Sequence, residues 1–211
     1  MTKIGYFIRP EITPLSRINF TALKAKGISE VYIRATNGGT TAYTNLKTYY
    51  SQIVGAGLKP YAWVWQGFSH SKEVTDMGFH TVLDLETYEI EGYLPEVKQM
   101  REDTRGKTFI VCTKPDEWDG DQRWDLLAPL CDYLMPMLYL GDYHKSIPQL
   151  GDVTKRYDGK YPGMIYPAIE TYVSDENPIP KGNNVLLDEI SAIRSYVSGV
   201  ALFRYGLGEY E

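Results

Sequence analysis

The chain has 211 residues, of which 43% are hydrophobic, and its formal net charge is −5. This length suits one large domain with a full core, and we expect a single domain over residues 1–211. Lys and Arg form no cluster, which argues against a nucleic-acid partner, because phosphate binding requires a concentrated basic surface. No apolar run approaches the roughly 20 residues that a membrane-spanning helix needs.

Eight strand-like runs alternate with helix-like stretches along the chain. The runs begin near Lys3, Glu30, Lys59, His80, Thr108, Asp132, Gly163 and Gly199. Strict alternation predicts a parallel sheet covered by helices, and eight such units close into a single compact (β/α)8 TIM barrel. An open, doubly wound sheet is the alternative, but Ile8–Glu11 lacks the glycine-rich turn which that fold uses for phosphate. Val173–Asn184, rich in Pro, Asn, Asp and Gly, is predicted to be a loop on the active face of the barrel.

Cysteine and histidine usage further restricts the chemistry. Cys112 is predicted late in a strand and Cys131 at the end of the following helix, so the two thiols should lie too far apart for a disulfide. Free thiols suit a reducing compartment. The three histidines are scattered without metal-ligand spacing, and we expect neither a metal nor another cofactor. The stretch Met1–Tyr6 lacks a signal peptide, which leaves the localisation open; we expect a monomer.

Two acids end the fourth predicted strand, His80–Glu86. Side chains two residues apart on a strand share a face, so Asp84 and Glu86 should lie side by side. Burying two carboxylates together costs free energy, which favours a functional reason for them. Paired acids at the end of a strand are what a glycosidase needs, because one must protonate the leaving oxygen. The charge of Asp84 should raise the pKa of Glu86 and keep it protonated near neutral pH.

Barrel enzymes carry their chemistry at the C-terminal ends of the strands, where further polar and aromatic residues are predicted here. Glu170, on the seventh strand, is a candidate third catalytic carboxylate. A separation of about 5 Å from Glu86 would allow a retaining mechanism, and roughly 6.5–9.5 Å an inverting one. The chain holds 18 Tyr and 4 Trp, whose rings stack on sugars. The candidate substrate-binding residues at this rim are Arg34, Trp63, Trp65, Tyr139 and Arg204.

Each candidate also has a purely structural interpretation. Asp84 could pair with Arg34 and Glu170 with Arg204, while the tryptophans could fill the barrel interior. Tyr139 could equally be a core tyrosine or a hydrogen-bonding partner of the substrate.

Four segments in the first half of the chain resemble glycoside hydrolase family 25, the lysozyme-like muramidases. Ile18–Ile28 resembles that family's "I-D-W … V-K-x-x-G-I" helix, Glu30–Gly39 its "F-V-x-I-K-A-T-E-G" strand, and Ala56–Trp63 its "A-G-L-x-V-G-A-Y" segment. Leu83–Glu86 matches "L-D-x-E". The resemblance implies Glu86 as the acid, Asp84 as an assisting group and Trp63 in the place of an active-site tyrosine.

The chain departs from that family in two places. Phe7 stands where the "G-x-D-x-S" strand carries its aspartate. In the second half, Met135–Tyr139 and Gly199–Tyr205 are more similar to strands of family 18 chitinase-like barrels, whose "D-x-x-D-x-D-x-E" is matched only at Asp84 and Glu86.

Together these resemblances imply a divergent glycosidase whose substrate is a cell-wall-type polysaccharide, such as peptidoglycan, pseudomurein or another N-acetylated glycan, as in a viral or prophage lysin. Two alternatives stay open. One is a carbohydrate-binding barrel without catalysis, and the other a retaining glycosidase that uses Glu86 and Glu170.

Overall fold

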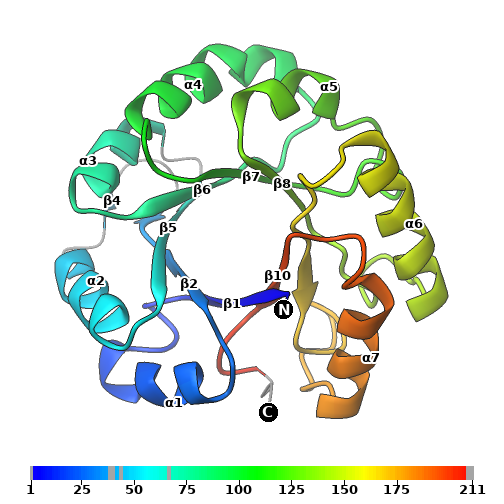
Figure 1. Ribbon diagram of the computed structural model, residues 1–211, viewed down its shortest axis with the longest axis horizontal. Coiled ribbons are helices and arrows are strands. Elements are labelled where there is room, and N and C mark those ends of the chain that lie inside the picture. The colour runs from blue at the N-terminus through cyan, green and yellow to red at the C-terminus, as the bar shows by residue number, and fades with distance from the viewer. Residues whose placement is uncertain (1, 38–40, 43–44, 66–67, 208–211) are drawn as a thin grey trace.

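The computed structural model describes residues 2–37, 41–42, 45–65 and 68–207. Eight parallel strands form one sheet in the order β8-β7-β6-β5-β2-β1-β10-β9. Their bounds are β1 Lys3–Ile8, β2 Glu30–Arg34, β5 Lys59–Trp65, β6 His80–Asp84, β7 Phe109–Thr113, β8 Tyr133–Pro136, β9 Ala168–Glu170 and β10 Gly199–Phe203. Parallel bridges from Leu134 to Ile165 and from Met137 to Ala168 join the two outer strands. The sheet therefore closes, which confirms the predicted TIM barrel (Figure 1).

Seven α-helices of the described part surround the barrel (Figure 1). They are α1 Phe20–Ala25, α2 Leu46–Gly55, α3 Ser71–Asp76, α4 Ile90–Asp103, α5 Trp124–Leu127, α6 Ile147–Lys160 and α7 Asn183–Ile193. A short antiparallel ribbon, β3 Thr36–Asn37 with β4 Thr41–Ala42, follows β2 and was not predicted from the sequence. No helix in the described ranges is long and apolar enough to cross a membrane.

The inside of the barrel is rich in aromatic rings, whereas mainly aliphatic side chains fill the layer between the sheet and the helices. At the N-terminal end of the strands, buried Glu30 accepts hydrogen bonds from the hydroxyls of Tyr32 at 2.8 Å and Tyr166 at 2.6 Å. A buried carboxylate is tolerated when such donors surround it. Some of the tyrosines noted in the sequence therefore stabilise the barrel floor, far along the strands from the C-terminal mouth.

The structure also agrees with the prediction that the two cysteines do not form a disulfide. Cys112 and Cys131 are separate buried thiols. Burial raises the pKa of the Cys112 thiol, which keeps it protonated.

Candidate active site

A small cavity of about 120 Å³ opens at the C-terminal ends of the strands. Acids and aromatic rings make up most of its wall, in a place where barrel enzymes carry their chemistry. The residues that line it are Phe7, Trp63, Asp84, Glu86, Cys112, Met137, Tyr139, Asp175 and Phe203. The structure thus brings together Asp84, Glu86, Trp63 and Tyr139 of the predicted site residues.

A larger cavity, of about 780 Å³, lies outside the barrel between α1 and the start of α7. The described residues around it include Arg17, Lys26 and Lys181 but no carboxylate. Catalytic sites usually bring together several ionisable groups with perturbed pKa values. The smaller cavity at the mouth of the barrel has such groups, so it is the better candidate for the active site.

Asp84 lines the mouth cavity and is only 4% exposed. Its Oδ2 accepts a hydrogen bond of 2.8 Å from the indole Nε1 of Trp63, on the neighbouring strand β5. Its Oδ1 is buried and has no hydrogen-bond partner among the residues that the structure describes. An unsatisfied buried oxygen is costly in a native fold, so its presence in a cavity wall indicates a place for a polar atom of a ligand.

Glu86 follows β6 and is exposed at the rim of the same cavity. The cavity walls partly desolvate its carboxyl, which raises its pKa. Lys114 opposes this shift, and the negative charges of Asp175 and Asp119 add to it. A raised pKa is what a general acid requires near neutral pH.

The pKa of Asp84 is raised further than the sequence led us to expect. Burial, with the charge of Glu86 as a second cause, raises it to about 8, although the Trp63 hydrogen bond and the charge of Arg34 oppose the shift. Asp84 therefore keeps a proton at neutral pH, whereas we had expected it to be the charged partner of Glu86. The protons of such an interacting pair belong to the pair as a whole.

This shift predicts how the stability of the fold depends on pH. Unfolded Asp84 releases its proton near its ordinary pKa of 3.8, but folded Asp84 holds it to about 8, so stability falls as the pH rises between these values. Asn at this position keeps an acceptor for Trp63 and never charges. We expect Asp84→Asn to raise the Tm at pH 8 and to change it little at pH 4. An equal change at both pH values would contradict the buried, protonated state of Asp84.

A polar network occupies the rim beside Glu86. Lys114 pairs with Asp119 at 3.1 Å and donates a hydrogen bond of 3.0 Å to the hydroxyl of Tyr88. Asp119 accepts further hydrogen bonds from Tyr88 at 2.5 Å and Tyr143 at 3.0 Å. The sequence places Asp119 in a loop, where an acid usually contacts solvent and stabilises a turn. The structure instead makes it the centre of the network that sets the charge around Glu86.

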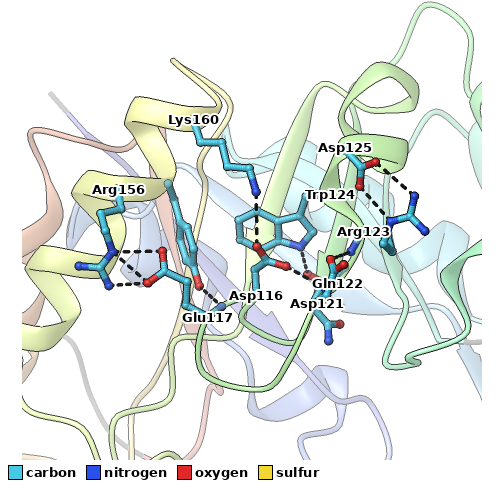
Figure 2. A network of polar contacts seen from close by, with 11 residues as sticks. Asp116, Glu117, Asp121, Gln122, Arg123, Trp124, Asp125, Arg156 and Lys160 are labelled. Carbon is cyan, nitrogen blue, oxygen red and sulfur yellow. Dashed lines mark hydrogen bonds and ion pairs between the residues drawn. The ribbon is translucent and has the colours of Figure 1, made fainter.

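The loop between β7 and α5, which carries this network, is braced against α6 (Figure 2). Arg156 of α6 pairs with Glu117 at 2.6 Å, and Lys160 lies 3.7 Å from Asp116. Asp116 also accepts a 2.8 Å hydrogen bond from the backbone N–H of buried Gln122. The loop is therefore held at both ends, which positions its rim residues relative to β6.

Arg34 and Trp65 lie beside the cavity and do not line it. The Arg34 guanidinium pairs with Glu11 at 2.7 Å and lies over the rings of Trp63 and Trp65, with its carbon 5.4 Å and 4.9 Å from their centroids. Such a stack holds the Trp63 ring in place. Arg34 thus acts on the cavity through Trp63 and through its charge. Arg204 follows Phe203 at the end of β10 and is half-buried outside the cavity lining.

Glu170 is placed differently from the expectation drawn from its sequence position. It is fully buried at the end of β9 and does not line the cavity with Asp84 and Glu86. Its Oε1 accepts hydrogen bonds from the backbone N–H of Gly141 at 2.7 Å and from Lys181 Nζ at 3.3 Å. Lys181 also pairs with buried Glu189 of α7 at 2.9 Å. The ion-pair partner of Glu170 is thus Lys181, and the contacts of this carboxylate are structural.

Asp175 takes the position at the cavity that was expected of Glu170. It lies in the predicted active-face loop, and its Oδ1 accepts a 2.6 Å hydrogen bond from the hydroxyl of Tyr172. Its backbone N–H donates to Asp142 Oδ1 at 2.8 Å. The only sequence signal for Asp175 is an acid within that loop, and nothing in a strand pattern tells such an acid from its neighbours.

The remaining cavity wall suits a flat, hydroxyl-rich ligand. The Tyr139 ring stacks on Phe203, with centroids 5.7 Å apart and planes 18° apart. The Tyr139 hydroxyl has no hydrogen bond to another described residue, and it is available to a ligand. No group of three or more His, Cys, Asp or Glu side chains in the described ranges could hold a metal ion.

No protein-family model matches the chain, and no curated protein sequence matches it. Its fold is similar to that of a β-galactosidase from the psychrophilic Marinomonas ef1, with 12% identity and a TM-score of 0.71 over 96% of this chain. The match covers 54% of that protein, so the chain spans about half its length.

Two other solved structures match this chain over nearly their full length. The PgaB (BpsB) glycoside hydrolase domain from Bordetella bronchiseptica is 10% identical, with a TM-score of 0.70, and the match covers 98% of this chain and 95% of that one. A GH18 chitinase from Pseudoalteromonas aurantia is 11% identical, with a TM-score of 0.65, and the match covers 97% and 94%. At these identities the likeness shows the TIM-barrel fold, and the resemblance to family 25 stays a prediction.

Proposed function

We propose that this protein is a glycoside hydrolase that cleaves a cell-wall-type polysaccharide, with Glu86 as the general acid. The observation that carries the proposal is the pair of acids with raised pKa values, Asp84 and Glu86, in an aromatic-walled cavity at the C-terminal mouth of the barrel. Similar solved structures include glycoside hydrolases, which supports this class of reaction on this fold.

In the proposed reaction, the Glu86 proton moves to the glycosidic oxygen as its bond to the anomeric carbon breaks. The electron pair of that bond stays on the leaving oxygen. A water molecule later adds its oxygen to the anomeric carbon and gives up one proton, which restores the protonated form of Glu86. Trp63, Tyr139 and Phe203 offer rings and a hydroxyl against which the sugar is oriented. The positive charge that develops on the sugar is stabilised by Asp175 or by a neighbouring group of an N-acetylated substrate.

A carbohydrate-binding barrel without catalysis is the second candidate. It is favoured by Phe7, which lines the cavity where the resembling family has an aspartate. A retaining enzyme that uses Glu86 and Glu170 is disfavoured, because Glu170 is buried against Lys181 and outside the cavity lining.

One experiment separates these candidates. The purified protein is incubated with peptidoglycan, pseudomurein and chitin, and both the reducing ends released and the protein that pellets with each polymer are measured. We expect release from at least one polymer. Pelleting without release from any of them would instead favour the binding barrel, and neither release nor pelleting would reject both candidates.

Lys114 offers a test of the acid's identity through the pH profile. Its positive charge is the main interaction that lowers the pKa of Glu86, so its removal leaves that pKa higher. A general acid works in its protonated form, and we expect Lys114→Met to move the basic limb of kcat/KM to higher pH. Lys160→Met, which alters the same loop through Asp116, is the matched control and should leave the profile unmoved. A basic limb that stays in place in Lys114→Met would argue against Glu86 as the titrating acid.

A further inference from the structure

We propose that Arg204, with Arg9 beside it, binds a carboxylate group of the sugar at the mouth of the barrel, so that an acidic sugar is the preferred ligand. The inference rests on the proposed function, since it names the class of sugar that the same site receives.

Three arginines lie at the C-terminal ends of three neighbouring strands. Arg34 is the last residue of β2, Arg9 follows β1 and Arg204 follows β10. Since β1 pairs with both β2 and β10, these strand ends are adjacent on one side of the mouth (Figure 1). The backbone N–H of Tyr205 donates a 2.9 Å hydrogen bond to the carbonyl of Phe7, which fixes the end of β10 against the end of β1. The mouth therefore has a cationic side.

Glu11 pairs with two of these arginines, and the third has no carboxylate partner. Glu11 Oε1 lies 2.7 Å from Arg9 Nε and 2.7 Å from Arg34 Nη1. Within the described ranges the Arg204 side chain forms no ion pair and no hydrogen bond, and its Nε is buried without an acceptor. A buried donor of a charged group is costly to leave unsatisfied. The open fork of guanidinium donors fits the two oxygens of a carboxylate.

The charges around Arg204 also favour an anion. Burial lowers the pKa of Arg204, and the positive charge of Arg9 lowers it further. The charges of Asp175 and Glu11 oppose this shift, each by less than Arg9, and neither carboxylate lies within ion-pair distance of Arg204. An arginine stays protonated in a protein, so its charge here is left for a bound anion to compensate.

Arg204 lies beside the mouth cavity. Phe203, the residue before it, lines the cavity, and so does Asp175, whose charge acts on Arg204. The aromatic wall of the cavity holds the ring of the sugar. A carboxylate on that sugar, directed toward the end of β10, then meets the guanidinium while the glycosidic oxygen stays at Glu86.

The acids in the cavity do not exclude such a sugar. Burial raises the pKa of Asp84 to about 8, so it is neutral near pH 7, and Glu86 as the proton donor acts in its neutral form. Asp175 is then the one charged carboxylate of the described lining, and Arg204 lies near it. An acidic sugar therefore meets one repulsive group and, on the same side, the arginine that attracts it.

Two kinds of sugar carry a suitable carboxylate. A uronic acid has it at C6, and a muramic acid has it on an ether-linked lactyl group. The probes are glucuronic acid and N-acetylmuramic acid, each compared with its methyl ester, which keeps the shape and removes the charge. A single sugar has no glycosidic bond to a second sugar, so its binding is measured without cleavage.

Dissociation constants for the four probes are measured by NMR titration at pH 7 with the wild type, Arg204→Met, Arg204→Lys and Arg194→Met. Arg194 is the matched control, because it is an exposed arginine at the end of α7, where the chain returns to the start of β10 and the far end of the barrel. Thermal unfolding of each variant is recorded on the same samples. The Tm of Arg204→Met should stay unchanged or rise, because the cation that it removes has no carboxylate partner in the described chain.

We expect the wild type to bind at least one acid about tenfold or more tightly than its ester, the value of one charged hydrogen bond. Arg204→Met should lose this difference and bind the esters as the wild type does, and Arg194→Met should keep it. Arg204→Lys keeps the charge without the fork and should keep only part of the difference. The acid that shows the difference identifies the source of the carboxylate.

Three results would overturn the inference. One is equal affinity of the wild type for each acid and its ester, or no detectable binding of any probe. The others are a difference that survives in Arg204→Met and an equal loss in Arg204→Met and Arg194→Met. Because no bond is cleaved in this experiment, the glycosidase proposal depends on the release of reducing ends and fails or stands separately.

Discussion

Glu86→Gln is expected to abolish sugar release while the fold stays intact. Glutamine has nearly the same shape but no proton to give, and loss of a general acid typically costs about 10²–10⁴-fold in rate. The side chain is exposed at the rim, and its carboxyl pKa is raised by its surroundings, so replacing it with a neutral group should leave the Tm unchanged or higher. Release of reducing ends and thermal unfolding, measured on the same sample, test both parts.

Glu89→Gln is the matched control, because Glu89 is an exposed acid three residues further along the chain and outside the cavity lining. It should keep the wild-type rate. If Glu86→Gln unfolds the protein, Glu86 has a structural role. If it cleaves at the wild-type rate, the acid lies elsewhere.

Lys181→Met is expected to have the largest effect on stability. Lys181 is 8% exposed in its side chain and pairs with two buried acids, Glu170 and Glu189. Removing it leaves both carboxylates buried without a cation, which costs about 3–5 kcal/mol in the free energy of unfolding. Lys160→Met breaks a pair whose lysine is 61% exposed, and it should cost about 0–1 kcal/mol.

The size of this loss should depend on pH. Burial raises the pKa of Glu170 to about 7 and also raises that of Glu189, so both acids protonate readily in the folded state as the pH falls. A protonated acid needs no cation, and Lys181→Met should therefore be less destabilising at pH 5 than at pH 8. Denaturant unfolding at both pH values measures this difference. A loss below about 1 kcal/mol at pH 8, the size of a surface pair, would contradict the buried arrangement.

The same arrangement allows a direct test of Glu170 in catalysis. We infer that Glu170→Gln affects stability and leaves the rate per folded molecule close to that of the wild type, because the carboxylate faces Lys181 and Gly141. Recovery of activity by azide in Glu170→Ala would instead identify a nucleophile at this position.

The barrel could be predicted from the sequence because its signals are local and repeated. Each strand is a short apolar run, and β–α alternation leaves few other ways to bury eight such runs. The acid pair was visible for the same reason, since two carboxylates on a buried strand break the pattern. Both features depend on residues close together in the chain.

The position of Asp175 at the mouth cavity could not be predicted, because it depends on loop geometry. Glu170 ends a strand and Asp175 lies five residues later, and strand ends are where barrel chemistry is expected. Lys181, eleven residues beyond Glu170, donates a hydrogen bond to it, and Glu170 is not among the residues that line the mouth cavity. Long-range contacts of this kind leave no periodic signal.

The protonation state of the acid pair could also be predicted only in part from the sequence. A raised pKa for the pair follows from two adjacent acids on a strand. Which acid is more strongly shifted depends on burial, and Asp84 is 4% exposed while Glu86 is at the rim. The alternation of side chains along a strand places both acids on one face, so it cannot show which of the two is more deeply buried.

The central claim is that Glu86 donates the proton to the leaving oxygen, and leaving-group dependence tests it most directly. A dinitrophenyl glycoside needs no protonation of its leaving group, whereas a natural oligosaccharide does. On a sugar that the wild type cleaves, we predict that Glu86→Gln keeps most of its activity on the dinitrophenyl glycoside and loses about 10²–10⁴-fold on the oligosaccharide. An equal loss on both substrates would contradict the role of Glu86 as the acid.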